Sequence, residues 1–386
     1  MTQLHFKHPI LVVTLGWPPM KGGAAVVMTN LLSAITKESA VVATIDLKGA
    51  VKPPTHGFRL HQVMWARKIS GRLEGIIRRV QVPFVARRLA KLAKKYDCRA
   101  ILGVYPDLFM LSSAYEASRL TGLPFIPYLH DTLAEALSVR KEAAYALRLQ
   151  KKLFATSANI FVMSGGMRDL YLQKYNLETT ALCHTFPEEI PSEPATGQVE
   201  PNGFHSGSVY NINENALLRV KHALHRCNMS LYLTTVQNKE FIESRGFKGV
   251  KMGFMETRAD LLATLARQSF LILALDWVDE TEGHADELGT IFPTKTIEYL
   301  ASGRPILLHC PENYFLTRFC QEHDCAEIVN ERSEDALVAA MERLRTDKER
   351  ALQLSRNALR TAAMFSLPQI AQTFYDGVAP HLEDKA

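Results

Sequence analysis

Lys295 and Glu298 are the two residues whose types and spacing best suit the binding of a charged ligand. They stand three positions apart, so a helix would place both side chains on one face. An ammonium group attracts phosphate, and a carboxylate accepts hydrogen bonds from hydroxyl groups such as those of a ribose. The pair therefore predicts a site for a ligand that carries a diphosphate and a sugar. An exposed helix ion pair without a ligand is the alternative.

The residues around this pair carry the signals of a helix start and a helix end. Pro293 fits the first turn of a helix, and Gly303 fits the residue that ends it. A helix that begins at Pro293 or Thr294 leaves the N–H groups of Thr294, Lys295 and Thr296 without partners inside the helix. With the positive end of the helix dipole, Thr294 and Lys295 are the predicted diphosphate contacts.

Two glycine-containing loops come directly after apolar runs. Gly22 and Gly23 follow the first run of the chain, and Gly207 and Ser208 follow a run in its second half. Glycine has no Cβ, so the backbone at these loops can approach a ligand closely. All four residues are therefore candidate ligand contacts, and an ordinary strand end is the alternative at Gly207 and Ser208.

His130 and Asp131 follow the apolar run at residues 125–129. The carboxylate of Asp131 could fix the tautomer of the His130 ring, which makes the two residues candidates for a catalytic role. A structural histidine is the alternative. Ser164 and Gly165 follow the next apolar run and are further candidates for the same site.

The elements that position these residues alternate along both halves of the chain, which predicts α/β architecture. The expected strands are residues 10–15, 41–45, 100–104 and 125–129 in the first half and 204–209, 230–234 and 270–275 in the second. The expected helices are residues 26–35, 108–120, 215–226 and 258–267.

The polar segment 186–203, rich in Pro, Glu, Gly and Ser, predicts a linker between domains at 1–185 and 204–363. The predicted fold is therefore two Rossmann-like α/β domains that face each other across a cleft. Ligands of open parallel sheets bind beyond the carboxyl ends of the strands, so the site is expected in that cleft.

Composition narrows the class of protein. The chain has 386 residues, of which 47% are hydrophobic and 22% charged, and no apolar run approaches the roughly 18 residues that span a bilayer. The apolar stretch near the N-terminus is short and is interpreted as a first strand. Six scattered cysteines without a CxxC motif are typical of a reducing compartment, so we expect a cytoplasmic protein. The sequence has no cluster of His and Cys residues with metal-ligand spacing, and we expect neither a bound metal nor a cofactor.

Charge is concentrated in one segment. Residues 67–99 contain eleven Lys and Arg residues against two acidic ones, Glu74 and Asp97. We expect this stretch to contact an anionic membrane at its inner face or a lipid phosphate; a solvated helix face is the alternative. Nucleic acid is not an expected partner, because no binding motif accompanies the charge.

The segment from Phe292 to Ile306, Phe-Pro-Thr-Lys-Thr-Ile-Glu-Tyr-Leu-Ala-Ser-Gly-Arg-Pro-Ile, resembles the donor-site signature of family 4 glycosyltransferases. It is most similar to the branch with the pattern Pro-x-Lys-x-x-Glu-Tyr-Leu-Ala-x-Gly-x-Pro. The loop Trp-Pro-Pro-Met-Lys-Gly-Gly after the first strand and the stretch Pro-Tyr-Leu-His-Asp at residues 127–131 resemble two further motifs of that family.

The resemblance implies the GT-B fold and transfer of a sugar from a nucleotide sugar, by analogy a UDP-sugar, to a glycan or lipid-linked acceptor. It implies retention of the anomeric configuration, no essential metal, and His130, Asp131 and Glu298 as catalytic residues. Polysaccharide biosynthesis is the expected context. The segment 364–386 resembles a C-terminal helix that returns to the first domain.

The sequence departs from the family pattern at two places. Thr290 stands where the family commonly has a second Glu, and the usual basic pair of the second domain is not recognisable. Asp286 or Glu287, in the acidic loop before the signature, could contact a sugar hydroxyl instead, and a flexible acidic loop is the alternative. A nucleotide-sugar 2-epimerase and a non-catalytic nucleotide-sugar-binding relative are the other functions considered.

Overall fold

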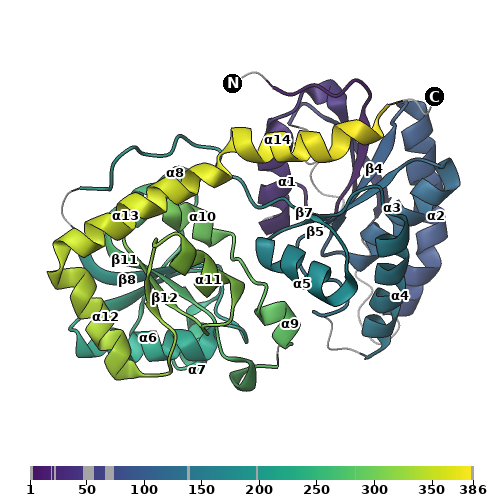
Figure 1. Ribbon diagram of the computed structural model, residues 1–386. Coiled ribbons are helices and arrows are strands. Elements are labelled where there is room, and N and C mark those ends of the chain that lie inside the picture. Colours follow the sequence, from purple (N-terminus) through teal and green to yellow (C-terminus); the bar gives the residue numbers. More distant parts are fainter. Residues whose placement is uncertain are drawn as a thin grey trace. The chain divides into compact units, whose positions relative to one another are not determined.

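The chain forms two compact units, each built on its own parallel sheet (Figure 1). A computed structural model describes residues 3–18, 20, 23–46, 56–65, 74–136, 140–196, 199–282 and 284–383. Unit 1 contains Met1–Thr185 and Leu367–Ala386, and unit 2 contains Phe186–Ser366. The two units are described separately below.

Unit 1 is built on a sheet with the strand order β3-β2-β1-β4-β5-β6-β7, all pairs parallel, in the part of the chain that the structure describes. Its strands are β1 (Ile10–Val13), β2 (Ala40–Asp46), β3 (Arg59–Trp65), β4 (Ala100–Tyr105), β5 (Phe125–Leu129), β6 (Phe161–Val162) and β7 (Thr180–Ala181). Every residue of β1, β4 and β5 is buried. Strands covered on both faces consist of continuous apolar runs, which is why these were predictable.

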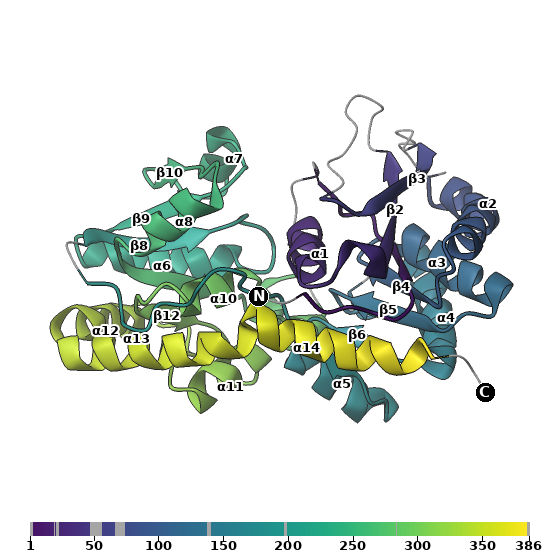
Figure 2. The same ribbon diagram turned by 90° about the horizontal axis from the view of Figure 1, so that it is seen from above.

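Helices connect these strands. They are α1 (Gly23–Ser33), α2 (Glu74–Lys95), α3 (Leu108–Thr121), α4 (Arg140–Thr156), α5 (Gly165–Tyr175) and α14 (Leu367–Val378). At the start of α3, Asp107 accepts a hydrogen bond from the Met110 N–H over 2.7 Å, and Gly122 ends the helix with a φ of 73°. α2 and α3 lie side by side in both ribbon views (Figures 1 and 2).

α14 comes last in the chain but packs within unit 1, where it contacts α1. The Phe374 ring lies 5.8 Å from the rings of both Phe6 and Phe161. Asn159 Nδ2 donates to the carbonyl of Gly377 over 3.1 Å, and a Cβ at Gly377 would stand 2.5 Å from the Phe161 ring. The glycine therefore allows the close approach that fixes the end of the helix.

Unit 2 has the strand order β10-β9-β8-β11-β12-β13, again parallel. The strands are β8 (Glu200–Ser206), β9 (Ser230–Thr234), β10 (Lys251–Gly253), β11 (Gln268–Ala274), β12 (Ile306–His309) and β13 (Glu327–Val329). β8 begins four residues before the predicted strand and takes in the end of the predicted linker 186–203. Its polar start is held by neighbours: the Glu200 N–H donates to Arg267 O over 2.8 Å, and the Ser269 hydroxyl donates to Glu200 O over 2.7 Å.

The helices of unit 2 enclose a core that alternate residues of β11 enter. Phe270, Ile272 and Ala274 share one face of the strand and pack with buried side chains of α6 and α12. The helices are α6 (Glu214–Arg226), α7 (Lys239–Ser244), α8 (Arg258–Leu265), α9 (Ala285–Leu288), α10 (Lys295–Leu300), α11 (Phe315–Glu322), α12 (Glu334–Thr346) and α13 (Lys348–Ala362).

Both sheets have the strand order of a doubly wound Rossmann fold, in which the order reverses beside the first strand. The predicted class, two Rossmann-like α/β domains, is confirmed. In unit 2 the reversal lies between β8 and β11, so the residues just after β8 stand at the place where such sheets bind ligands. Of the helices within the described ranges, none has the length and apolarity that crossing a bilayer requires.

Candidate functional site

The structure brings Lys295 and Gly207 together at the carboxyl end of the sheet of unit 2. Gly207 follows β8 with a φ of 106°, a backbone conformation that favours glycine. A Cβ on Gly207 would lie 3.2 Å from Lys295 Nζ, so the ammonium group occupies the space that the missing side chain leaves. Two candidate residues almost 90 positions apart in the sequence thus lie side by side.

His205, the neighbour of this pair, holds the lysine head group. Its Nδ1 lies 3.1 Å from the carbonyl oxygen of Ile272, which can only accept, so Nδ1 carries the proton. Nε2 therefore accepts from Lys295 Nζ over 2.9 Å. Burial and the nearby Lys295 charge hold the pKa of His205 well below its usual value, so the ring is neutral.

The pKa of Lys295 is lowered to about 7, because burial disfavours its charged form, while nearby Glu298 opposes the shift. At neutral pH the group is therefore balanced between ammonium and amine. A bound anion would favour the ammonium and draw in a proton. The site can thus change its charge on binding, which a fully exposed lysine does not do.

Glu298 pairs with Arg258, not with Lys295. Arg258 Nη1 donates to Glu298 Oε1 over 2.5 Å, while its Nη2 donates to Glu188 over 3.0 Å and its Nε also binds that carboxylate. The guanidinium stacks 5.3 Å from the centre of the Phe186 ring. The predicted alternative of a Lys295–Glu298 ion pair is therefore wrong. Among the residues with a described placement, Glu298 Oε2 has no hydrogen-bond partner and remains available to a hydroxyl.

The backbone N–H groups of the site are only partly available, which corrects the sequence prediction. The Thr296 N–H donates to Pro293 O over 2.9 Å, and the Gly207 N–H donates to Thr234 O over 2.8 Å. The N–H groups of Thr294, Lys295 and Ser208 have no partner in the part of the chain that the structure describes. α10 begins at Lys295, and Thr294 precedes it in helical conformation without a side-chain cap.

The rest of the signature serves the fold. The Tyr299 hydroxyl is 2.8 Å from the Ser206 N–H, which donates to it, and so fixes the end of β8. Gly303 has a φ of 70°, as predicted for a helix end, and its carbonyl accepts from the Ala195 N–H over 3.1 Å. Arg304 Nη1 donates to the Ala195 carbonyl over 3.1 Å. These residues dock the segment before β8 onto the sheet.

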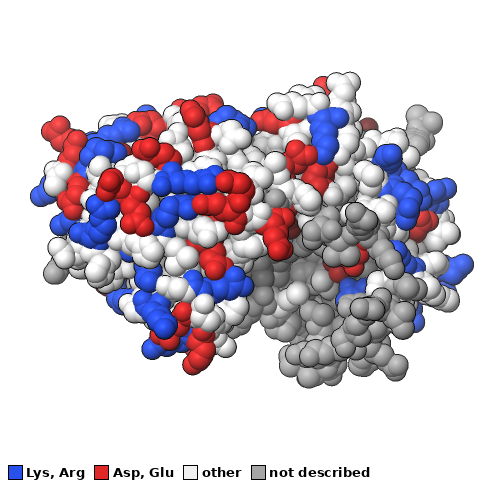
Figure 3. Space-filling model, turned by 90° about the horizontal axis from the view of Figure 1, so that it is seen from below, with Lys and Arg blue, Asp and Glu red and all other residues white. Residues whose placement is uncertain are grey.

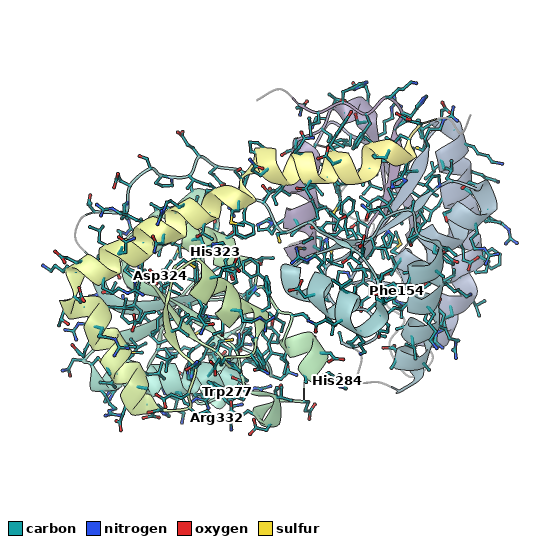
Figure 4. The ribbon with its side chains drawn as sticks, in the orientation of Figure 1. Phe154, Trp277, His284, His323, Asp324 and Arg332 are labelled. Atoms are coloured by element: carbon teal, nitrogen blue, oxygen red, sulfur yellow. The ribbon has the colours of Figure 1, made fainter. Side chains whose placement is uncertain are left out.

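The start of the acidic loop is anchored by ring contacts and ion pairs. Trp277 contacts two guanidinium groups, with Arg219 4.9 Å and Arg332 5.3 Å from its ring centre. Figure 4 labels Trp277 and Arg332 on unit 2. Arg219 binds Glu280 through two hydrogen bonds of 2.6 and 3.0 Å, and Arg332 Nη1 donates to Asp279 over 2.8 Å. These contacts form a neutralised aromatic and ionic cluster on unit 2.

Further along this loop lie the two acidic residues considered as sugar contacts. Asp286 and Glu287 are part of the short helix α9. Thr290 is buried, and its hydroxyl donates to the Glu287 carbonyl over 2.8 Å. The position where the family has a second acid therefore continues the turn after α9.

In unit 1, His130 lies directly after β5, as predicted. Its ring contacts that of Tyr128 with centres 4.3 Å apart, and burial and nearby His184 lower its pKa to about 3. Asp131 is exposed, and within the described ranges no hydrogen bond joins it to His130, so the predicted fixing of the tautomer by Asp131 is wrong. The buried His130 Nε2 has no partner among the described residues. A neutral ring of this kind can bind a hydroxyl but is a poor proton donor.

The glycine loop of unit 1 is only partly visible. Gly22 lies outside the described residues. Gly23 begins α1, and a Cβ there would meet nothing within 4 Å, which leaves open space at the helix start. Gly16 is the glycine that packing requires, because its Cβ would stand 2.9 Å from Ala25 N. Ser164 caps α5 by accepting from the Met167 N–H over 3.1 Å, so its role is structural.

Sequence reasoning missed three residues of unit 2 that complete the site: His205, Arg258 and Glu188. His205 had a signal, because a histidine inside an otherwise apolar strand has to be paired. Arg258 and Glu188 had none. They lie 40 and 110 positions from Glu298 in segments that looked like an ordinary helix start and a linker.

Comparison with known proteins identifies the fold. No protein-family model matches the sequence. No curated protein sequence matches it either. Among solved structures, sucrose-phosphate synthase from Thermosynechococcus elongatus is similar with a TM-score of 0.68 and 14% identity, covering 96% of this chain and 98% of that one. Anabaena HepE in complex with UDP and glucose gives 0.66 and 15%, covering 96% and 98%, and a glycosyltransferase from Rickettsia africae gives 0.66 and 12%, covering 98% and 100%. Similarity over nearly the whole of each chain shows that this chain has the GT-B fold.

Proposed function

We propose that the chain is a glycosyltransferase that moves a sugar from a nucleotide sugar to a glycan or lipid-linked acceptor. The observation that carries the proposal is the placement of Lys295 Nζ against Gly207, at the point of the unit 2 sheet where the strand order reverses. A positive charge there suits a diphosphate. Similar structures hold UDP, UDP-glucose, or UDP and glucose, which supports UDP as the nucleotide of the donor.

In this proposal the residues of unit 2 hold the donor and stabilise the leaving group. Lys295, protonated on binding, balances the charge that develops on the nucleoside diphosphate as the sugar departs. Glu298, oriented by Arg258, accepts a hydrogen bond from a ribose hydroxyl through its remaining oxygen. On unit 1, neutral His130 is proposed to bind a hydroxyl of a substrate. Retention and independence from metal ions are part of the proposal and rest on the family resemblance and on a sequence without an Asp-x-Asp motif.

One observation favours a second candidate, a relative that binds a nucleotide sugar without turning it over. Thr290 is buried and bonded to the preceding turn, and it supplies no carboxylate where the family has one. This candidate shares the donor site and differs only in product formation. A 2-epimerase would also bind the donor, and it would convert the sugar without releasing the nucleotide.

A panel of nucleotide sugars tests the proposal. Purified protein is expected to gain thermal stability with one of them and to release its nucleoside diphosphate slowly. Glu298→Gln should lower the donor affinity and the release rate about tenfold or more and so reduce the thermal shift, whereas Glu312→Gln, at an exposed position outside the site, should leave them unchanged. Stabilisation without release would favour the non-catalytic relative, and no response to any donor would refute the proposal. The anomer of the sugar released first reports retention or inversion.

Binding of the donor should depend on pH through Lys295. Without ligand the pKa of Lys295 is about 7, and a bound diphosphate raises it. The donor affinity should therefore be highest below pH 7 and fall about tenfold per pH unit above it, until the pH reaches the raised pKa. Calorimetry at pH 7.5 in two buffers of different ionisation enthalpy should show uptake of roughly three-quarters of a proton. At pH 6 the uptake should nearly vanish, since the lysine is already charged. Equal enthalpies in the two buffers at pH 7.5 would contradict this role.

A further inference from the structure

A groove on unit 1 combines an apolar floor with a basic rim. It lies between α2 and α4 over α3 and has a volume of about 340 Å³. Val82, Pro83 and Leu149 are among the residues that form its floor. Its charged lining residues are the cations Arg79, Arg87, Arg148 and Lys152 and a single acid, Glu116. The groove thus presents excess positive charge next to apolar surface.

Three of these cations, Arg87, Arg148 and Lys152, are not neutralised by any residue that the structure describes in unit 1. Arg87, Arg148 and Lys152 are exposed, and the structure records no ion pair for them with any residue whose placement it describes. On unit 2 the pattern differs, because Arg219, Arg258 and many other arginines bind carboxylates. Unpaired cations on a shared rim create a positive potential that only an external anion can balance.

Large apolar side chains on the three helices of the groove are exposed to solvent. Val80 and Phe84 on α2 are each 63% exposed, Leu120 at the end of α3 is 55% exposed, and Leu147 on α4 is 41% exposed. Val80, Phe84 and Arg87 recur at helical spacing, so they share one side of α2. Exposed apolar groups interleaved with cations are typical of surfaces that lie in the interface of a membrane.

The charges visible on one face of the molecule agree with this contrast. In the face drawn in Figure 3, blue and red side chains are mixed over unit 2, on the left, whereas blue predominates along the right-hand edge, over unit 1. An even mixture of charges disperses the field, and a single-sign patch concentrates it. The patch is therefore suited to a large anionic surface.

We propose that this face of unit 1, defined by Val80, Phe84, Arg87, Arg148 and Lys152, binds the surface of an anionic phospholipid bilayer. In this arrangement the cations contact lipid phosphates and the apolar side chains enter the interfacial region. This explains why the cations have no recorded ion pair and why the apolar side chains are exposed. The sequence expected such a contact from residues 67–99 alone. Residues 67–73 lie outside the described ranges, and α4 supplies two of the three cations of the surface.

Vesicle sedimentation with the full-length protein tests the proposal without reference to sugar transfer. At 50 mM NaCl the protein should sediment with vesicles of phosphatidylcholine containing about a third phosphatidylglycerol, and not with pure phosphatidylcholine. Raising the salt to 500 mM should release most of it. Failure to bind the anionic vesicles at low salt would overturn the proposal, whatever the outcome of the donor assays.

A matched pair of triple variants locates the surface. Arg87→Gln, Arg148→Gln and Lys152→Gln together should weaken vesicle binding roughly a hundredfold, at about fivefold per charge near an anionic membrane. Lys248→Gln, Arg267→Gln and Lys348→Gln remove the same charge from exposed positions of unit 2 and should change binding less than threefold. Equal losses in both variants would show that net charge alone drives binding and would refute the assignment of this face.

Phe84→Trp tests insertion, because bromine on lipid acyl chains quenches only an indole that enters the bilayer. Fluorescence of this variant should shift to the blue and be quenched by brominated lipid, relative to the wild-type protein. Absence of quenching would exclude the apolar part of the proposal. Two other occupants would also overturn it: a dimer in size-exclusion chromatography that Phe84→Ser dissociates, or equal affinity for a short RNA that the Arg87, Arg148 and Lys152 variant loses.

Discussion

Lys295→Gln is expected to weaken the binding of UDP about a hundredfold. Lys295 is the one group of the candidate site that supplies a full positive charge beside Gly207 in the described part of unit 2. A hydrogen bond to a charged partner contributes about 1.5–3 kcal/mol, and removal of the charge leaves the diphosphate without a counter-ion. Calorimetric titration of UDP into the variant and the wild-type protein measures the loss directly.

The glutamine variant separates a loss of charge from a loss of structure. Glutamine is uncharged and one bond shorter than lysine, so it fits the buried space beside His205 without a clash, and the thermal midpoint without ligand should stay within a few degrees of the wild-type value. Lys348→Gln, on an exposed turn of α13, changes net charge equally and should leave the affinity within twofold. If the Lys295 variant binds UDP as tightly as the wild-type protein, the proposed donor site is wrong.

Gly303→Ala is expected to destabilise unit 2 by about 3 kcal/mol, which corresponds to a midpoint lower by roughly 6–12 °C. The residue has a φ of 70°, and a Cβ would stand 2.7 Å from Ala195 N and 3.1 Å from Pro194 Cα. Both neighbours are backbone atoms, so the clash cannot be relieved by a change of rotamer. The variant must move the segment before β8 or distort the end of α10. Differential scanning calorimetry should show the shift.

Gly249→Ala isolates the contribution of the backbone conformation. Gly249 has a φ of 74° in the same unit, but a Cβ there would meet nothing within 4 Å. This control should lose only about 1 kcal/mol, the usual cost of a left-handed alanine. Similar midpoints for the Gly303 and Gly249 variants would show that contact with Ala195 and Pro194 contributes nothing to stability.

Much of the fold was predictable, because buried parallel strands read as continuous apolar runs. β5 and β9 have the predicted bounds, and α3 and α6 differ from the prediction by one residue. The start of β8 was not predictable. Glu200 and its neighbours are polar, and they adopt strand conformation because Arg267 and Ser269 of the adjoining segment bond their backbone. Local propensity carries no information about such pairing.

The candidate site also contains residues that the sequence could predict and residues that it could not. Lys295 and Glu298 were predictable from a motif whose spacing defines one helix face. Their partners were not, because His205 and Arg258 reach the site through the fold. The prediction of a free N–H at Thr296 was wrong because the turn that begins at Pro293 supplies a carbonyl acceptor three residues earlier.

Some residues of the signature stabilise the fold and others are candidates for ligand binding, and this difference affects which of them persist during evolution. Tyr299, Gly303 and Arg304 hold β8 and the segment before it, so selection for a folded protein alone would preserve them. Selection for folding alone would not preserve Lys295, because burial of its charge destabilises the folded state unless an anion is bound. A descendant that abandoned its ligand would therefore keep most of the motif and change Lys295 first. Whether a relative still binds the ligand is therefore indicated better by the residue at this position than by the length of the sequence that matches the signature.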